Sequence, residues 1–338
     1  MLSRRKMKLN FGAIFKECKE MSKKYKVGVD LGGTNIAVGV IDENYNIIGR
    51  GRLKTNVPRP AEEIFADIVK GVKIAAENAK ISLDQIESIG IGTPGNVNKE
   101  TGYIEYANNL NFNQVPAVKM INELIDAKVF LENDANCAAL GEAVAGVGKG
   151  KKLFIAVTLG TGVGGGIIND GKVMAGCNEA GGELGHMVIE MNGIPCNCGR
   201  VGCWEAYASA TALVEQTKKA MLDHKDSKMW ALASGSLENV NGRTAFDAMR
   251  AGDEWGSRVV DRYIEYVAVG TVNIINVFQP EMICFGGGIC NEGETLLAPL
   301  RKYVEKFRYS KYSSTQTELC RAKLGNDAGI IGAALISY

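Results

Sequence analysis

The sequence has no excess of charge of either sign and no long apolar run. Its 338 residues include 39 lysines and arginines against 38 aspartates and glutamates, for a net charge of +1. This balance argues against a nucleic-acid-binding surface and against an acidic tail. No apolar stretch is long enough to span a membrane, and the basic residues 1–8 lack the apolar run that follows in a signal peptide. We therefore expect a cytoplasmic protein with small-molecule ligands and neither nucleic-acid nor membrane partners.

The length and the pattern of the chain favour the α/β class. With 46% hydrophobic residues, the chain can bury a substantial core and form two domains or one large α/β unit. Apolar residues recur on one helical face of 61–79, after Pro58 and Pro60. Strands are expected at 89–91 and 282–285, and further helices from 206, over 259–278 and from 326. Residues 1–25 are charged and only loosely helical, and we assign them no function.

Nine cysteines are present, but most lack a pattern. Six of them are scattered, which suits reduced thiols in a cytosol: Cys18, Cys137, Cys177, Cys284, Cys290 and Cys320. The other three follow the pattern Cys196-x-Cys198-Gly-x-x-Gly-Cys203, shortly after His186. Three thiolates and an imidazole form a typical ligand set for structural zinc, although three small buried hydrophobic residues could also fall together by chance. Glu205 follows closely, so a metal here would hold its carboxylate in place and position a binding site.

Two glycine-rich segments repeat one pattern. Residues 27–42 align without a gap on residues 155–170, and each reads as a strand, a Gly/Thr-rich turn and a second strand. Glycine at such a turn exposes backbone N–H groups to an anion, so two turns indicate two lobes that grip one polyphosphate. A single hairpin of this kind would more often be an ordinary tight turn. Because 36–40 alternates like a strand, the pattern is not the strand-to-helix fingerprint of a dinucleotide site.

Asp134 is the candidate catalytic residue. It lies where an apolar strand ends and an alanine-rich helix begins, and a carboxylate there can accept a proton from a substrate hydroxyl during phosphoryl transfer. The alternative is that Asp134 serves only as the helix N-cap. Asn109, in a loop, could bind hydroxyls or form a local turn. Glu183, between glycines and close to His186, is expected to do more than face solvent. The glycines 286–288 follow a strand end, where ligands bind in open α/β sheets.

Together these motifs resemble the repressor, open reading frame, kinase (ROK) family of sugar kinases, within the actin-like ATPase superfamily. The resemblance extends from residue 26 to the C-terminus, with the motifs in family order. It implies a two-lobed α/β, ribonuclease H-like fold with the active site in the interdomain cleft. After the extension 1–25, a small domain would span 26–135, completed by the C-terminal helix 326–338, and a large domain would span 136–325.

The resemblance also implies roles for residues. Asp134 would be the general base, and Asp30 would organise Mg²⁺ beside ATP. The nucleotide would contact two phosphate loops and an adenosine site, comprising Gly32, Gly33, Thr34, Thr161, Gly162, Gly286, Gly287 and Gly288. The sugar would be held by Asn109, Asn133, Asp134, Glu183, His186 and Glu205. The zinc ligands would be His186, Cys196, Cys198 and Cys203, and the metal would be structural.

The sugar itself is left open by the sequence. Glu205 after Cys203-Trp, with Asn109 and His186, looks most like the glucokinase branch. Kinases for N-acetylmannosamine, N-acetylglucosamine, allose and fructose share nearly the same hydroxyl-binding set. A sugar-responsive repressor would need a DNA-binding domain for which the segment before Asp30 is too short, and a non-catalytic sugar-binding protein would not need Asp134. Family members are usually homodimers.

Overall fold

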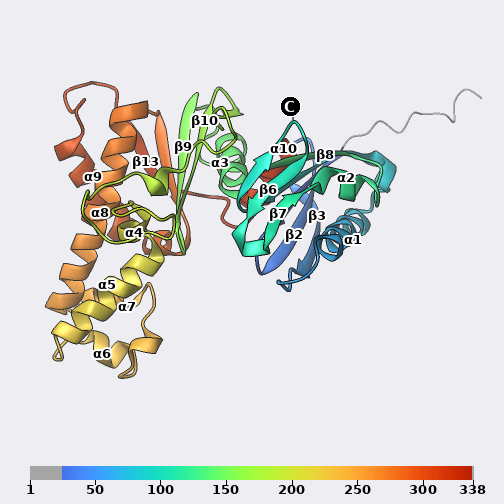
Figure 1. The fold of residues 1–338 in the computed structure, drawn as a ribbon. Coiled ribbons are helices and arrows are strands. Elements are labelled where there is room, and N and C mark those ends of the chain that lie inside the picture. The colour runs from blue at the N-terminus through green and yellow to red at the C-terminus, as the bar shows by residue number, and fades with distance from the viewer. Residues whose placement is uncertain (1–24, 337–338) are drawn as a thin grey trace, which may run out of the picture.

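The computed structural model describes residues 25–336 and has two α/β lobes (Figure 1). The first sheet has the order β3-β2-β1-β4-β8 and the second has the order β11-β10-β9-β12-β13. The first comprises β1 (Tyr25–Leu31), β2 (Asn35–Ile41), β3 (Ile47–Lys54), β4 (Ile86–Thr93) and β8 (Lys128–Asn133). The second comprises β9 (Leu153–Leu159), β10 (Val163–Asn169), β11 (Lys172–Val173), β12 (Met282–Gly286) and β13 (Glu318–Arg321). A third, three-stranded sheet comprises β5 (Asn96–Asn98), β6 (Tyr103–Ala107) and β7 (Phe112–Val115).

The two large sheets share one topology. In each, an antiparallel hairpin is followed by a third antiparallel strand on its outer side, and two parallel strands complete the other side. The predicted hairpins are β1–β2 and β9–β10, and both are antiparallel in the structure. The repeat in the sequence is therefore a repeat of half a sheet, and the α/β prediction is confirmed.

The helices cover the sheets and complete both lobes. They are α1 (Ala61–Ala79), α2 (Ala117–Asn122), α3 (Asp134–Val144), α4 (Glu205–Ala208), α5 (Ala210–Asp223), α6 (Met229–Leu232), α7 (Thr244–Arg250), α8 (Glu254–Phe278), α9 (Glu294–Phe307) and α10 (Asp327–Leu335). Short 3-10 turns are η2 (Leu83–Gln85), η3 (Asn108–Leu110), η4 (Leu184–His186), η5 (Leu237–Asn239) and η6 (Gly288–Glu292). Within 25–336, no helix combines the length and apolar character needed to cross a membrane.

The helix predicted at 61–79 shows how local sequence fixes an element. It begins after Pro60, whose missing N–H costs nothing at a helix start. Its predicted apolar face, which includes Phe65 and Ile68, is fully buried against the first sheet. It ends at Lys80, which adopts a left-handed conformation and donates its N–H to the carbonyls of Ala76 and Glu77.

Helices α3 and α10 lie between the two sheets and meet each other closely (Figure 1). A Cβ on Gly332 of α10 would lie 1.7 Å from the carbonyl oxygen of Cys137 in α3, and a Cβ on Gly28 of β1 would lie 1.8 Å from the carbonyl oxygen of Ile330. Only glycine allows such backbone contact. The predicted domain boundary after residue 135 falls inside α3, which also packs on β9 and β10.

Candidate active site

A cavity of about 1040 Å³ opens between the two lobes, and it brings most of the predicted site together. Asp30, Asn109, Asn133, Asp134, Thr161, Gly162, Glu183, His186, Glu205, Gly286, Gly287 and Gly288 all line it. They come from both sheets and from loops that are far apart in the sequence. The carboxyl ends of β1, β8 and β12 all point residues at this cavity, as expected for a ligand site in an α/β sheet.

The tip of the first hairpin is outside this lining. Gly32, Gly33 and Thr34 do not line the cavity, although Asp30 on the same hairpin does. The tip is closed on itself by a hydrogen bond from the N–H of Gly32 to the carbonyl of Asn35 (2.9 Å), and the hydroxyl of Thr55 donates to the carbonyl of Gly32 (2.6 Å). A Cβ on Gly33 would touch Asn109 at 3.5 Å. The tip thus packs on η3. It is not part of the cavity lining, although Asp30 on the preceding strand is.

The tip of the second hairpin is held by the start of α5. The N–H of Ala210 donates to the carbonyl of Gly160 (2.8 Å), and the hydroxyl of Thr211 donates to the carbonyl of Thr161 (2.8 Å). With the carbonyls of Gly160 and Thr161 hydrogen-bonded to α5, Thr161 and Gly162 line the cavity. The tip therefore suits an anion that approaches its remaining backbone N–H groups.

Asp134 is the first residue of α3, but it is not the N-cap. That role belongs to Asn133, whose Oδ1 accepts hydrogen bonds from the N–H groups of Ala135 (2.9 Å) and Asn136 (3.2 Å). The alternative that Asp134 is only a cap is therefore wrong. Asp134 Oδ1 also accepts from the N–H of Ala135 (2.8 Å), which leaves Oδ2 available to a substrate. Asn133, predicted to hold sugar, has its side chain oxygen engaged by the helix and its Nδ2 donating to the carbonyl of Gly95 (3.2 Å).

The cavity contains two carboxyl groups with raised pKa values. Burial raises the pKa of Asp134, although the hydrogen bond from Ala135 opposes this shift. Burial, and then the charge of Asp134, raises the pKa of Asp30 to about 6. The two carboxylates thus repel each other inside one cavity, and a divalent cation would relieve this repulsion. Perturbed carboxyls of this kind are typical of functional sites.

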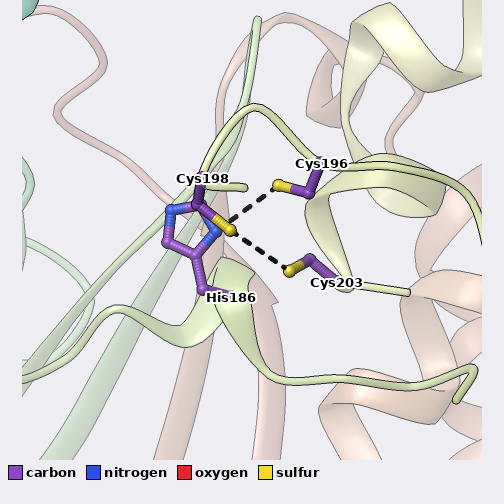
Figure 2. Close-up of side chains that lie close together, drawn as sticks. All are labelled: His186, Cys196, Cys198 and Cys203. Carbon is purple, nitrogen blue, oxygen red and sulfur yellow. Dashed lines mark hydrogen bonds between the residues drawn. The ribbon is translucent and has the colours of Figure 1, made fainter. Parts of the chain in front are cut away.

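The four predicted metal ligands converge. The ligand atoms of His186, Cys196, Cys198 and Cys203 all lie within 4.8 Å of one another (Figure 2). The Sγ atom of Cys196 is 3.7 Å from Nδ1 of His186, and the Sγ atoms of Cys198 and Cys203 are 3.6 Å apart. A tetrahedral zinc ion with bonds of about 2.0–2.3 Å holds its ligand atoms roughly 3.5–3.8 Å apart. The donor set and the spacing therefore fit such an ion.

His186 and Glu205 connect this cluster to the cavity. Nδ1 of His186 faces Cys196, while Nε2 lies 4.0 Å from the carboxylate of Glu183, which is 63% exposed. Glu205 has Oε1 3.9 Å from the Sγ of Cys196, and its Oε2 accepts a hydrogen bond from the N–H of Val163 (2.9 Å). Because a Cβ on Gly162 would lie 2.2 Å from that oxygen, the second hairpin tip needs glycine there. The cluster is therefore connected to two parts of the cavity lining: to Glu183 through His186, and to the second hairpin tip through Glu205.

Some polar groups of the cavity were not predicted. Arg321 donates from Nη2 to Oδ1 of Asn291 (2.6 Å), and both line the end of the cavity near Gly286. The amide of Asn136 is buried in the wall, with its oxygen unpartnered. Arg321 could have been found, because it ends β13, the parallel neighbour of β12. Asn136 gave no signal, since its position in α3 suggested only a helix.

The fold and the cavity define a class, the two-lobed actin-like ATPase fold, with two α/β halves of like topology and the site between them. Residues 26–337 match the ROK family, to which this chain belongs. The chain is 37% identical to a glucokinase of Thermotoga maritima over 94% of this chain and 98% of that protein. It is also similar to the crystal structure of a ROK family glucokinase from Streptomyces griseus in complex with glucose and AMPPNP. That likeness has a TM-score of 0.77 and 33% identity, over 92% of this chain and 98% of the other.

A ROK hexokinase from Thermus thermophilus gives a similar match. Its TM-score is 0.75 and its identity 32%, over 92% of this chain and 97% of the other. The likeness in all three cases covers more than nine tenths of this chain, and so extends over both lobes. The family expectation drawn from the sequence motifs is thus confirmed.

Proposed function

We propose that this protein transfers the γ-phosphoryl group of ATP to the 6-hydroxyl of glucose, forming glucose 6-phosphate. It is an ATP-dependent sugar kinase, and we propose glucose as the acceptor because several of its relatives are named glucokinases. The observation that carries the proposal is that Asp134 lines one cavity together with a glycine-rich hairpin tip and the sugar-binding candidates Asn109, Glu183 and His186. A hydroxyl and a phosphate can be aligned only in such a shared space.

Asp134 acts as the general base in this proposal. Its free oxygen accepts the proton of the attacking hydroxyl, as the hydroxyl oxygen bonds to the γ-phosphorus and the bond to ADP breaks. Asp30, whose charge interacts with that of Asp134, suits Mg²⁺, which supplies charge neutralisation for the phosphates when bound. Thr161 and Gly162 contribute backbone N–H groups to the phosphates, and Gly286, Gly287 and Gly288 leave room for the adenosine. Gly32, Gly33 and Thr34 would reach the phosphates once the lobes close.

The sugar end uses groups around the cysteine cluster. We propose that the sugar hydroxyls are held by Asn109, Glu183, His186 and Glu205. Asn133 contributes indirectly, because its side chain caps α3 and fixes the backbone there. The cluster is proposed to hold a structural zinc ion, which orients His186 through Nδ1 and leaves Nε2 for a hydroxyl. We further propose a cytoplasmic homodimer that acts in glycolysis.

Other hexoses are the alternative acceptors. N-acetylmannosamine, N-acetylglucosamine, allose and fructose differ from glucose at one or two groups, so one or two hydrogen bonds would decide among them. A protein that senses sugar without catalysis would keep the sugar-binding residues but would have no use for two half-buried carboxyl groups, Asp30 and Asp134, whose charges interact. The two raised pKa values therefore favour the kinase over the sensor.

A panel of acceptors tests the proposal. ADP release should be measured with ATP and Mg²⁺ against glucose, mannose, allose, fructose and the two N-acetylhexosamines. We expect glucose to give the highest kcat/KM, by about tenfold or more over each epimer, because one lost hydrogen bond costs that much. A different dominant hexose would replace glucose within the same mechanism. ADP release with none of them would overturn the kinase.

We expect the activity to fall on the acid side of about pH 6. Both Asp30 and Asp134 must be ionised, and their pKa values are raised, to about 6 for Asp30. Activity should therefore be constant at neutral pH and decline as pH falls through this value. Since Mg²⁺ favours the carboxylate form, raising Mg²⁺ should move the decline to lower pH. A profile of kcat/KM at two Mg²⁺ concentrations measures this.

The decline is not expected to reflect unfolding. A carboxyl whose folded pKa is raised binds its proton more tightly in the folded state, so these two groups favour folding as pH falls from 7 towards 5. The melting temperature should accordingly not fall in parallel with activity over this range. A decline in activity that does not shift with Mg²⁺, or that parallels a fall in the melting temperature, would contradict the roles assigned to Asp30 and Asp134.

A further inference from the structure

Glu132 is a buried charge that the proposed chemistry does not use. It is the penultimate residue of β8, two positions before Asp134, and only 2% of its side chain is exposed. Its Oε1 accepts hydrogen bonds from the N–H of Asn133 (2.8 Å) and from Nδ2 of Asn136 (3.0 Å). A buried carboxylate is costly unless it also meets a cation. Here Nζ of Lys99 lies 2.7 Å from Oε2, so the charge is paired.

Lys99 has a second carboxylate partner, in the other lobe. It follows β5 of the first lobe, and its ammonium group also pairs with the carboxylate of Glu179. Glu179 belongs to residues 174–183, the segment that leaves β11 of the second sheet and leads to Glu183 and His186. Burial alone would lower the pKa of Lys99, but its hydrogen bonds to Glu132 and Glu179 outweigh burial and raise it. The ammonium group thus stays charged between the two carboxylates.

The segment 174–183 is otherwise held by its own lobe, where the N–H of Met174 donates to the carbonyl of Ile167 (2.8 Å) and Gly182 lies close to Gly165. It contains Gly176 and Gly182 with positive φ, and most of its residues are exposed. Within residues 25–336, Glu179 to Lys99 is the one salt bridge that joins this segment to the first lobe. Its far end passes close to Asn136, because a Cβ on Gly182 would lie 3.8 Å from the unpartnered Oδ1 of that residue. These two contacts, through Glu179 and near Gly182, both lead to residues that bond to Glu132.

We propose that Lys99 is a positioning residue, which latches segment 174–183 of the second lobe to Glu132 and so fixes Glu183 opposite Asp134. One end of the latch is rigid, because Glu132 is buried and bonded to the start of α3. The other end is the segment that leads into a sugar-binding candidate. The expected consequence of the latch is tight sugar binding, and this consequence rests on the proposed function. In the proposed function the nucleotide is held by the second hairpin tip and the glycines 286–288, so its binding is not expected to depend on the latch.

The first test is Glu179→Gln, which opens the latch and leaves the buried pair of Lys99 and Glu132 intact. We expect the KM for sugar to rise about fivefold, because that factor corresponds to the loss of one partly screened ion pair. The kcat and the KM for ATP should change less than about twofold. The melting temperature should be unchanged. Glu100→Gln removes the same charge from the exposed residue next to Lys99, and it should have wild-type kinetics. Equal rises in both KM values, or a wild-type KM for sugar, would overturn the latch.

A second variant guards against a purely structural effect. Lys99→Met alone would leave Glu132 buried without a cation and could unfold the protein. The double variant with Lys99→Met and Glu132→Gln removes both charges and keeps an acceptor for the N–H of Asn133. It should stay folded and reproduce the kinetics of Glu179→Gln. A folded double variant with wild-type KM for sugar would show that the ammonium group positions nothing.

Hydrogen exchange tests the latch independently of sugar kinase activity. Backbone amides of 176–182 should exchange about fivefold faster in Glu179→Gln than in the wild type, with no change in α8 as an internal reference. This readout needs no turnover. If the wild type transfers phosphate to no sugar, the proposed function fails, and unchanged exchange in this segment separately overturns the latch.

Discussion

Replacing Asp134 with asparagine should reduce kcat by about 100- to 10,000-fold, the usual contribution of a general base. The amide is nearly the same size as the carboxyl and keeps an oxygen that accepts from the N–H of Ala135. It cannot take up the proton of a sugar hydroxyl. The KM for ATP should change little, because the nucleotide site that we propose is formed by the second hairpin tip and the glycines 286–288. Steady-state kinetics with glucose, Mg²⁺ and ATP measure the loss.

The Asp134→Asn protein should be at least as stable as the wild type. Burial raises the pKa of Asp134, which means that the folded state disfavours the charged form at neutral pH. Removing that charge relieves the cost and also the repulsion from Asp30. Asp261→Asn, on the exposed face of α8, is the matched control and should retain full activity. Asp134→Asn with more than a tenth of wild-type kcat would remove Asp134 from the role of base.

Much of this site could be predicted from sequence, because its elements are local. The two hairpins repeat a pattern of apolar strands around glycine-rich turns, and nothing but that pattern was needed to align β1–β2 with β9–β10. The cysteine cluster was equally local: Cys196, Cys198 and Cys203 lie within eight residues of chain, and His186 is close by. Asp134 was found because a carboxylate at the junction of a strand and a helix can accept a proton from a substrate hydroxyl.

The parts that escaped prediction depend on tertiary contacts. Asn133 and Asp134 are both good caps by type, and only the backbone at the end of β8 decides that Asn133 is used. The first hairpin tip packs on η3 and is outside the cavity lining, and this contact between distant segments has no signal in the sequence. Lys99 and Glu179 are 80 positions apart in sequence and carry charges that, by type alone, belong on a solvated surface. Pairing across two lobes leaves no periodic signal in one chain.

Loss of the cysteine cluster should damage both ends of the cavity. We expect Cys198→Ser to bind less than about one tenth of the zinc of the wild type and to lose about 100-fold or more in kcat/KM for glucose. Cys198 is exposed, so the substitution removes a ligand and hardly alters packing. Metal content by elemental analysis and kinetics measure the two effects. Cys177→Ser, an exposed cysteine of the same lobe outside the cluster, should change neither.

The kinetic pattern should distinguish the cluster from the latch. The cluster is connected to the sugar end through His186, and to the second hairpin tip through Glu205, which accepts from the N–H of Val163. Cys198→Ser should therefore raise the KM for sugar and the KM for ATP together, whereas opening the Lys99 latch raises only the first. Zinc added to metal-stripped wild type should restore both values. Wild-type kinetics in a zinc-free protein would mean that Glu205 is held in place without a metal. A zinc ion in the cluster would then have no part in binding sugar or ATP.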